Sequence, residues 1–167
     1  MKNLFLLLLV GLFSGCAGYR IGPAKPATLS EIKSLAVPVF RNETLEPRIE
    51  ALVTNTIIQQ IQQDGTYRIE SEASADGVLE GSIESITRGR ARSVRGNVEA
   101  TAEFNLNVNL VVRLTNRATG EVLHTERVTG TTTFFVGADL QQQERQAVVL
   151  AAQDAAVRLT SRISEGW

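Results

Sequence analysis

Side chains suited to covalent or metal chemistry are scarce in this sequence. Its 167 residues include one cysteine, one histidine, one methionine and one tryptophan, and aromatic residues make up 5%. A single cysteine excludes a disulfide within the chain. A histidine-based metal site needs several ligands, and His124 stands alone. The sequence has no Gly-x-Ser-x-Gly, P-loop or Gly-x-Gly-x-x-Gly motif. These absences predict a protein that is not an enzyme and that uses no metal or cofactor.

A large charge imbalance and long hydrophobic runs are also lacking. The chain has 17 basic and 18 acidic residues, with a formal net charge of −1, so no overall field favours nucleic acid. The longest apolar run, Leu4 to Phe13, has about half of the ~20 residues that a membrane-spanning helix needs. We therefore expect no membrane-spanning helix in the mature protein.

The first sixteen residues have the features of an export signal. Lys2 gives a positive start, the run from Leu4 to Phe13 is apolar, and Ser14 and Gly15 are small residues in front of Cys16. This order resembles the lipobox of bacterial lipoproteins, although Phe13 stands where leucine is usual. Cleavage before Cys16 and acylation of its sulfur would explain the lone cysteine, and two or three acyl chains give stable anchoring. An ordinary signal peptide cleaved nearby is the alternative interpretation.

These features divide the chain into three parts. Residues 1–15 are predicted to be a lipoprotein signal peptide that is removed. Residues 16–31 hold the lipidated Cys16 and a tether rich in glycine and proline. Residues 32–167 are predicted to form a single domain. Ala17 after the cysteine permits transport to the outer membrane, because an aspartate at that position tends to retain lipoproteins at the inner membrane.

Hydrophobic periodicity predicts an α+β domain. We expect a short strand over 33–40, a helix that includes Pro47 and ends before Gly65, one bent strand over 67–90, and a pair of strands joined by a turn at Gly120. A helix over 139–163, with Asp139 as its N-cap, follows. The fold class is therefore a two-layer sandwich: a mostly antiparallel four-stranded sheet with two helices packed on one face.

Four arginines form the strongest local feature, and three of them are two residues apart: Arg88, Arg90, Arg92 and Arg95. In an extended chain, Arg88, Arg90 and Arg92 would share one face. Guanidinium groups bind phosphate in a bidentate manner, so these residues are candidates for a phosphate-bearing ligand such as lipopolysaccharide. Contacts with acidic groups of a partner, or a plain solvated hairpin end, are the alternatives.

A second candidate surface is the polar face of the strand around 103–114. Asn105, Asn107, Asn109 and Arg113 alternate there with apolar residues, with Val111 as the exception. This face is expected to meet either solvent or a partner. Phe134 and Phe135, at the end of the following strand, are expected to be core residues rather than a contact surface.

Three segments together resemble the LPS-assembly lipoprotein LptE family. They are "CAGYRIG" (Cys16 to Gly22), "LAVPVFRNETLEPRIEALVTNTI" (Leu35 to Ile57) and "ADGVLEGSI" (Ala75 to Ile83). The extra Ala17 before Gly18 departs from the usual opening. The resemblance implies a two-layer sandwich, an outer-membrane location facing the periplasm, and a place in the lumen of the LptD β-barrel. It also implies that the protein helps to assemble this barrel and can bind lipopolysaccharide.

A different envelope module is the competing interpretation. Some lipid-anchored periplasmic accessories, such as activators of a peptidoglycan synthase or of a secretion channel, share an opening like Ala36 to Phe40 followed by Asn-x-Thr. Such a protein would need neither phosphate binding nor a barrel partner.

Overall fold

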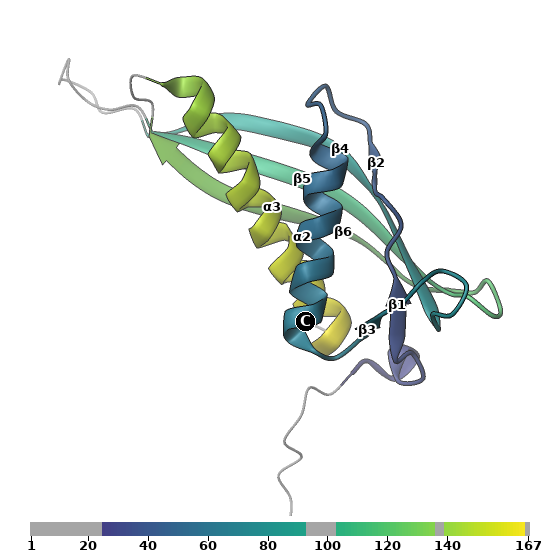
Figure 1. Cartoon of the computed structure of the whole chain (residues 1–167). Coiled ribbons are helices and arrows are strands. Elements are labelled where there is room, and N and C mark those ends of the chain that lie inside the picture. The colour runs from purple at the N-terminus through teal and green to yellow at the C-terminus, as the bar shows by residue number, and fades with distance from the viewer. Residues whose placement is uncertain (1–24, 93–102, 136–138, 166–167) are drawn as a thin grey trace, which may run out of the picture.

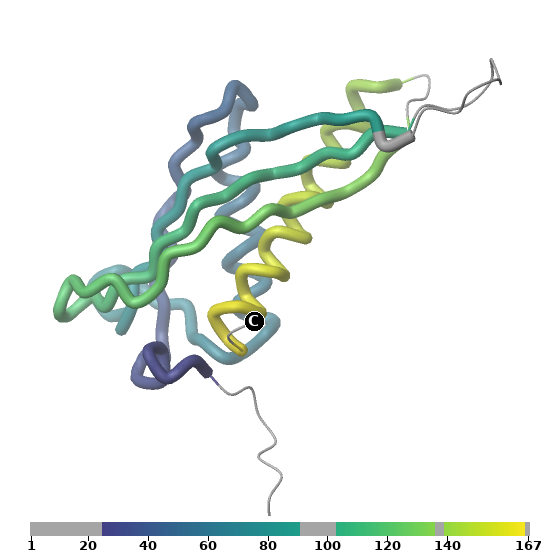
Figure 2. The backbone as a smooth tube through the Cα atoms, turned by 180° about the vertical axis from the view of Figure 1, so that it is seen from behind, coloured from purple at the N-terminus to yellow at the C-terminus, as the bar shows by residue number. Residues whose placement is uncertain are grey.

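The computed structural model describes residues 25–92, 103–135 and 139–165. In chain order the elements are η1 (Ala27–Leu29), β1 (Ser34–Ala36), β2 (Arg41–Asn42), α2 (Ile49–Asp64), β3 (Arg68–Ile69), β4 (Gly77–Arg92), β5 (Glu103–Asn116), β6 (Val122–Phe135) and α3 (Leu140–Glu165). The long helices α2 and α3 lie side by side across one face of the sheet (Figure 1). The view from behind shows the strands in front and the helices beyond them (Figure 2). The predicted two-layer α+β architecture is confirmed.

The sheet differs from the predicted four-stranded antiparallel one. It has six strands in the order β3-β1-β4-β5-β6, and β2 also pairs with β4. The three long strands β4, β5 and β6 are antiparallel, whereas β1 is parallel to both β3 and β4, and β2 is parallel to β4. The parallel pairs arise because α2 makes a crossover between β2 and β3, which returns the chain in the same direction.

Two predicted strands have different bounds in the structure. The strand expected over 33–40 is shortened to β1, because Pro38 has no N–H to donate and Phe40 turns inward, and β2 begins just beyond it. The Phe40 ring covers Gly81 so closely that a Cβ there would lie 2.2 Å from it. The strand expected over 67–90 becomes β3 and β4, separated by a turn in which Ser74 and Ala75 donate backbone hydrogen bonds to Ser71.

The core lies between the sheet and the two helices. On β5, residues Leu106, Val108, Leu110, Val112 and Leu114 are buried, and they alternate with more exposed residues as the sequence predicts. The facing side of α3 is built largely from alanines: Ala147, Ala151, Ala152, Ala155 and Ala156 are all buried. Burial of this continuous apolar surface is the main stabilising contribution to the domain.

Gly130 lets α3 approach β6 closely. A Cβ at this position would lie 2.0 Å from the backbone oxygen of Ala151 and 2.4 Å from the backbone nitrogen of Ala155. Asp154, on the same turn of the helix, accepts a hydrogen bond of 2.8 Å from the Thr131 backbone N–H of β6. The helix therefore rests on the backbone of this strand and also satisfies one of its donors.

The ends of the two helices follow the expected signals in part. Asp139 accepts a hydrogen bond of 3.0 Å from Gln142 N–H, which confirms it as the N-cap of α3. Gly65, with φ of 76°, ends α2 as predicted. Helix α2, however, begins after Pro47, at Ile49, because Arg48 has a left-handed φ of 63°. Among the described residues, no helix is both long and apolar enough to cross a membrane.

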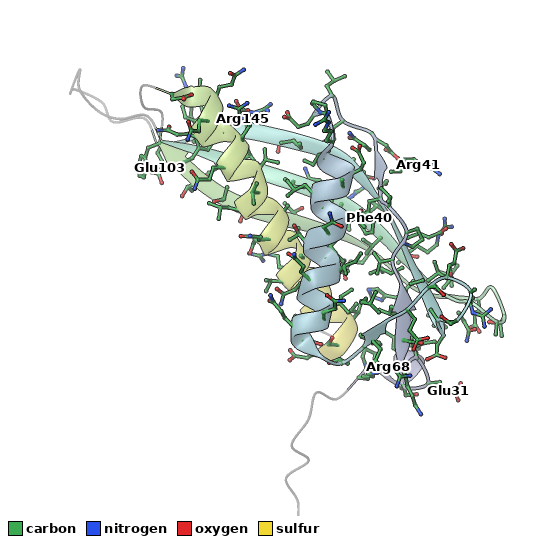
Figure 3. The ribbon with its side chains drawn as sticks, viewed as in Figure 1. Glu31, Phe40, Arg41, Arg68, Glu103 and Arg145 are labelled. Atoms are coloured by element: carbon green, nitrogen blue, oxygen red, sulfur yellow. The ribbon has the colours of Figure 1, made fainter. Side chains whose placement is uncertain are left out.

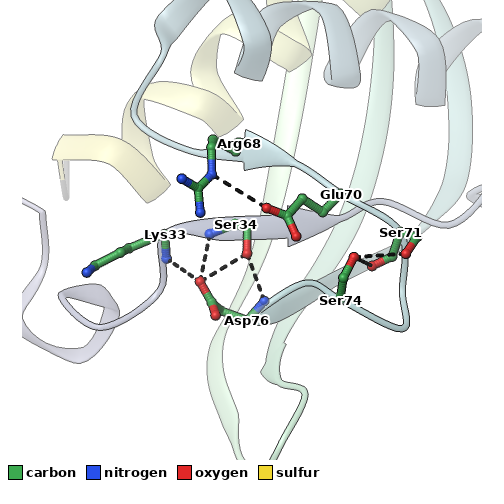
Figure 4. A network of polar contacts seen from close by, with 7 residues as sticks. All are labelled: Lys33, Ser34, Arg68, Glu70, Ser71, Ser74 and Asp76. Atoms are coloured by element: carbon green, nitrogen blue, oxygen red, sulfur yellow. Dashed lines mark hydrogen bonds and ion pairs between the residues drawn. The ribbon is translucent and has the colours of Figure 1, made fainter.

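Asp76 joins the beginning of β1 to the beginning of β4 (Figure 4). Its carboxylate accepts hydrogen bonds from the backbone N–H groups of Lys33 at 2.9 Å and Ser34 at 3.0 Å, and from the Ser34 hydroxyl. These bonds, with that from Lys33 as the largest cause, lower the pKa of Asp76. The Ala-Asp-Gly segment is therefore a structural link between two strands.

The packed domain begins before residue 32. Leu29, at the end of η1, is 1% exposed and belongs to the hydrophobic core, although it lies in the segment predicted as a tether. Lys25 is also held in place, since its Nζ donates to the Ile32 carbonyl at 2.8 Å and lies 4.1 Å from the centre of the Tyr67 ring. Cys16 lies outside the described residues.

Candidate functional site

Arg88 and Arg90 lie on the helix-covered side of the sheet, near the end of β4. The register pairs Arg88 with Leu106 and Arg90 with Phe104. A β-bulge between Ile83 and Ser85 causes this placement, because the extra residue Glu84 reverses which residues of β4 face the helices. Without the bulge, both arginines would extend the open face of the sheet.

Arg88 is already neutralised within the chain. Its guanidinium forms an ion pair with Glu144 of α3, and Nη2 lies 3.8 Å from Glu46 Oε2 in the turn before α2. The side chains of Arg88, Glu46 and Glu144 are 44%, 36% and 25% exposed. Two carboxylates around one guanidinium largely cancel its attraction for an external anion. Arg88 therefore mainly holds both helices against the end of β4.

Arg90 has a different environment from Arg88. Its side chain is exposed, and within the described ranges it has no ion pair. Arg145, next to Glu144 in α3, is also exposed and has no ion pair among these residues (Figure 3). A second register shift, between Arg90 and Arg92, places Arg92 opposite Glu103. Arg88 and Arg90 therefore share one face, as predicted, while the side chain of Arg92 lies outside the part of the chain that the structure describes. Arg95 lies outside the described residues.

An aromatic pair lies beside Arg90 across the sheet. Phe104 of β5 is opposite Arg90, and Phe134 of β6 is opposite Phe104. The two rings stack with their centres 5.9 Å apart and an interplanar angle of 29°. Arg90, Phe104 and Phe134 thus form a row across the sheet, from an exposed guanidinium through two stacked rings to the side near α3.

A groove of about 310 Å³ continues this row between β6 and the first half of α3. Its walls are formed by Thr133, Phe134, Phe135, Gln143, Gln146, Ala147 and Leu150. Phe135 and Leu150 are 57% and 47% exposed, so the groove presents apolar surface to the outside. Phe134 is buried as predicted, but Phe135 is not a core residue, because strand alternation turns it away from the helices.

The groove was not predicted, since its helical residues look unremarkable in the sequence. Gln143, Gln146 and Leu150 fit the ordinary pattern of an amphipathic helix. The available signal was the pair Leu140 and Leu150, which lie outside the alanine-rich stripe of α3 and are both exposed. Only the position of β6 shows that Leu150 lines a groove.

The predicted polar face is the side of the sheet that α2 and α3 leave open. Asn105, Asn107 and Asn109 lie on it, together with threonines of β6. Asn109 donates to Ser85 Oγ at 2.9 Å and accepts from Thr129 Oγ1 at 2.8 Å. Arg113 pairs with Glu80 at 3.6 Å. Val111, the apolar exception, lines a hollow of about 490 Å³ with Val39 and Val122, and neither Arg88 nor Arg90 lines this hollow.

His124 belongs to a structural contact between sheet and helix. Its Nε2 lies 3.1 Å from Glu126 Oε2, and the same carboxylate pairs with Arg162 of α3. Across the part of the chain that the structure describes, no cluster of three or more His, Cys, Asp or Glu side chains could hold a metal ion.

Solved structures share this fold at low sequence identity. A PelC dodecamer from Paraburkholderia phytofirmans is 17% identical, with a TM-score of 0.53, and the match covers 84% of this chain and 94% of that one. A minor lipoprotein from Acinetobacter baumannii is 14% identical, with a TM-score of 0.54 and coverage of 80% and 93%. A hypothetical protein from Chlamydia trachomatis is 9% identical, with a TM-score of 0.59 and coverage of 80% and 96%. These likenesses show the fold alone.

The sequence comparisons give a more specific result. No curated protein matches the chain. A family model, described as "LptE: Lipopolysaccharide-assembly", matches residues 32–163, which include every helix and strand from β1 to most of α3.

Proposed function

Since the chain belongs to the LptE lipopolysaccharide-assembly family, we propose that it is an outer-membrane lipoprotein that plugs and helps to assemble an LptD-type β-barrel. In this role it would support delivery of lipopolysaccharide to the outer leaflet. Anchoring would depend on acylated Cys16, and the domain would face the periplasm and the barrel lumen. The absence of a spanning helix among the described residues agrees with a domain held by lipid.

The row formed by Arg90, Phe104, Phe134 and the groove is the observation that supports direct lipopolysaccharide binding. A lipid that carries phosphate needs a cation for its headgroup and an apolar surface for its chains. Arg90 provides an exposed guanidinium, while Phe135 and Leu150 provide the exposed apolar surface. The aromatic stack lies between the two, so one amphiphilic molecule could contact both.

The four predicted arginines have separate roles in this proposal. Arg90 binds phosphate, with Arg145 as a second exposed guanidinium at the same end of the molecule. Arg88 is a positioning residue, because Glu46 and Glu144 occupy its guanidinium. Arg92 and Arg95 remain candidates for lipopolysaccharide or barrel contacts.

The partner is tested first by purification of the tagged, full-length lipoprotein from its own outer membrane, followed by mass spectrometry. Recovery of a large β-barrel in roughly equal amount would support the plug role. Recovery of a peptidoglycan synthase or a secretion channel would instead favour a lipid-anchored accessory of another envelope machine. Recovery of no partner would contradict the barrel assignment.

Lipopolysaccharide binding is tested with Arg90→Ser and with the matched control Arg68→Ser. Arg68 is an exposed arginine at the opposite end of the molecule, with Glu70 at 3.5 Å (Figure 3). We expect Arg90→Ser to weaken binding and to reduce its dependence on salt, since screening weakens exposed charge interactions. Arg68→Ser should bind as the unaltered protein does. Equal affinity of both variants would remove Arg90 from the site.

A further inference from the structure

Part of the open face of the sheet carries no charge. Three successive rows across β4, β5 and β6 hold only small neutral polar residues and one glycine. We call these nine residues the neutral field: Gly89, Asn105 and Thr133; Thr87, Asn107 and Thr131; Ser85, Asn109 and Thr129. With strands about 4.8 Å apart and about 6.8 Å between alternate residues, the field measures roughly 10 Å by 14 Å between its outer Cα atoms.

The charged residues nearest the other end of the field form ion pairs, whereas Glu103, opposite Phe135 at the near end, has no ion pair among the described residues. Arg127 Nη2 lies 2.9 Å from Glu84 Oε1, and Arg113 Nη2 lies 3.6 Å from Glu80 Oε2. Exposed protein surfaces normally mix charged residues of both signs throughout. On this face four charged residues are instead grouped in two ion pairs, and the nine residues of the field carry no charge.

Hydrogen bonds between strands hold the field's side chains in place. Thr129 Oγ1 donates to Asn109 Oδ1 at 2.8 Å, and Asn109 Nδ2 donates to Ser85 Oγ at 2.9 Å. Asn107 Nδ2 donates to Thr87 Oγ1 at 3.4 Å. Each amide nitrogen keeps a second N–H, and each hydroxyl oxygen keeps free lone pairs. These bonds fix five of the field's side chains and leave donors and acceptors unused, so little side-chain entropy is lost there on binding. Thr131 differs, because its hydroxyl is bonded to the Asp154 carboxylate of α3.

This array suits an uncharged ligand that is rich in hydroxyl groups. It offers no cation to a phosphate or carboxylate, and no apolar area to an acyl chain. Hydroxyl groups, which both donate and accept, match amides and other hydroxyls. At the end of β6, strand alternation places exposed Phe135 after Thr133, which adds one apolar ring beside the polar array.

The field is also continuous with the candidate lipid groove. Thr133 belongs to the neutral field and also lines the groove between β6 and α3. Phe135, which lies next to the field, lines the same groove. A molecule seated in the groove could therefore extend over the edge of β6 onto the field. Such a molecule would have an apolar part on one side and a neutral, hydroxyl-rich part on the other.

We propose that the neutral field binds the polysaccharide portion of lipopolysaccharide. The identity of this glycan rests on the proposed function. The physical content of the proposal is narrower: binding occurs through neutral hydrogen bonds on the open face, separately from the arginine-dependent contact on the helix-covered side.

The test uses polysaccharide released by mild acid from the bacterium's own lipopolysaccharide and then dephosphorylated, so that neither lipid nor phosphate contributes. The full-length lipidated protein in detergent is titrated with this probe by calorimetry. We expect the double variant Asn105→Ala, Asn107→Ala to lower affinity at least about tenfold, as loss of several neutral hydrogen bonds implies. Thr125→Ala, on the same face but outside the field, should have no effect.

Salt dependence separates this proposal from the arginine site. Since no charge is involved, polysaccharide affinity should change less than about twofold when the Debye length falls from about 10 Å to about 3 Å at 1 M salt. Arg90→Ser should leave this affinity unaltered, even if it weakens binding of intact lipopolysaccharide. Failure of Arg90→Ser alone would thus count against the lipid site and not against the field.

Three results would overturn the proposal. These are an unaltered affinity in the double variant with an unaltered melting temperature, a steep loss of polysaccharide binding with salt, and equal or tighter binding of peptidoglycan fragments to the same field.

Discussion

Ser34 and Asp76 exchange hydrogen bonds in both directions. The Ser34 hydroxyl donates to Asp76 Oδ2, and the Asp76 backbone N–H donates to Ser34 Oγ, each at 3.0 Å. The first residue of β1 is thereby joined to the residue just before β4, 42 positions further along the chain. The charged carboxylate is the acceptor for three donors, which makes this junction dependent on pH.

Asp76→Asn should lower the free energy of unfolding by about 1 kcal/mol at neutral pH, since Asp76 is exposed and its hydrogen bonds are partly screened. The pKa of Asp76 is lower in the folded state, so its contribution is present above the unfolded value of about 3.9 and is lost as the pH falls through the folded value. Denaturant unfolding, repeated from neutral to acid pH, should show that the difference in stability between Asp76→Asn and the unaltered protein becomes smaller. Glu72→Gln, an exposed carboxylate in the preceding turn, is the control and should show no such trend.

Tyr67 should ionise well above an ordinary tyrosine. Burial, and secondarily the charge of Asp64, raise its pKa to about 12, and its hydroxyl donates to the Ile163 carbonyl at 2.6 Å. Because the folded state holds this proton more tightly, stability should fall between about pH 10 and about pH 12. An ultraviolet titration of tyrosine ionisation should show a step near pH 12 that is absent in Tyr67→Phe. Persistence of that step in Tyr67→Phe would contradict the assignment.

Gly130→Ala should destabilise the domain by about 3 kcal/mol, because the new methyl group would overlap backbone atoms of Ala151 and Ala155 that cannot move without shifting α3. Gly89→Ala, in β4 of the same sheet, is a matched control, since nothing lies within 4 Å of the position that a Cβ would take there. Chemical denaturation should separate the two variants. Equal stabilities would mean that α3 does not rest on the backbone of β6.

Arg88 should matter more for stability than for ligand binding. A double-mutant cycle with Arg88→Ala and Glu144→Ala should give a coupling energy of about 0.5–1 kcal/mol, as expected for a partly exposed ion pair. The same cycle with Arg90 in place of Arg88 should give none. Coupling between Arg90 and Glu144 would mean that Arg90 is also occupied within the chain.

Cys16→Ala should leave the precursor without lipid and uncleaved at this site. Labelling of cells with a radioactive fatty acid, followed by immunoprecipitation, measures the modification directly. Incorporation of label into the variant would refute Cys16 as the anchor.

The strand pattern of β5 and both helix faces could be predicted because they depend on local periodicity. Apolar residues recur at every second position from Leu106 to Leu114. In α2 they recur with the helical period, at Ile49, Val53, Ile57 and Ile61. The buried face of each element can therefore be identified from the sequence. Asp139 and Gly120 follow from local turn and capping preferences in the same way.

The orientation of Arg88 and Arg90 could not be predicted, because it depends on one extra residue in β4. Glu84 gives no sign of a bulge by itself, and only the three-residue spacing of Ile83 and Ile86 hints at one. Whether Arg88 is free or paired depends on Glu46 and Glu144, which reach it from two other elements. The parallel pairing of β1 and the groove beside Leu150 likewise depend on tertiary arrangement.

The position of β1 also has a consequence for how the protein is made. This strand comes early in the chain, yet it lies between β3 and β4, and Tyr67 and Asp64 bond to Ile163 and Ser164 near the far end of α3. A nascent chain therefore cannot complete its core until its last helix has been synthesised and delivered. For a polypeptide that is exported, as proposed above, this delay would keep the chain without stable tertiary structure while it passes through a secretion channel.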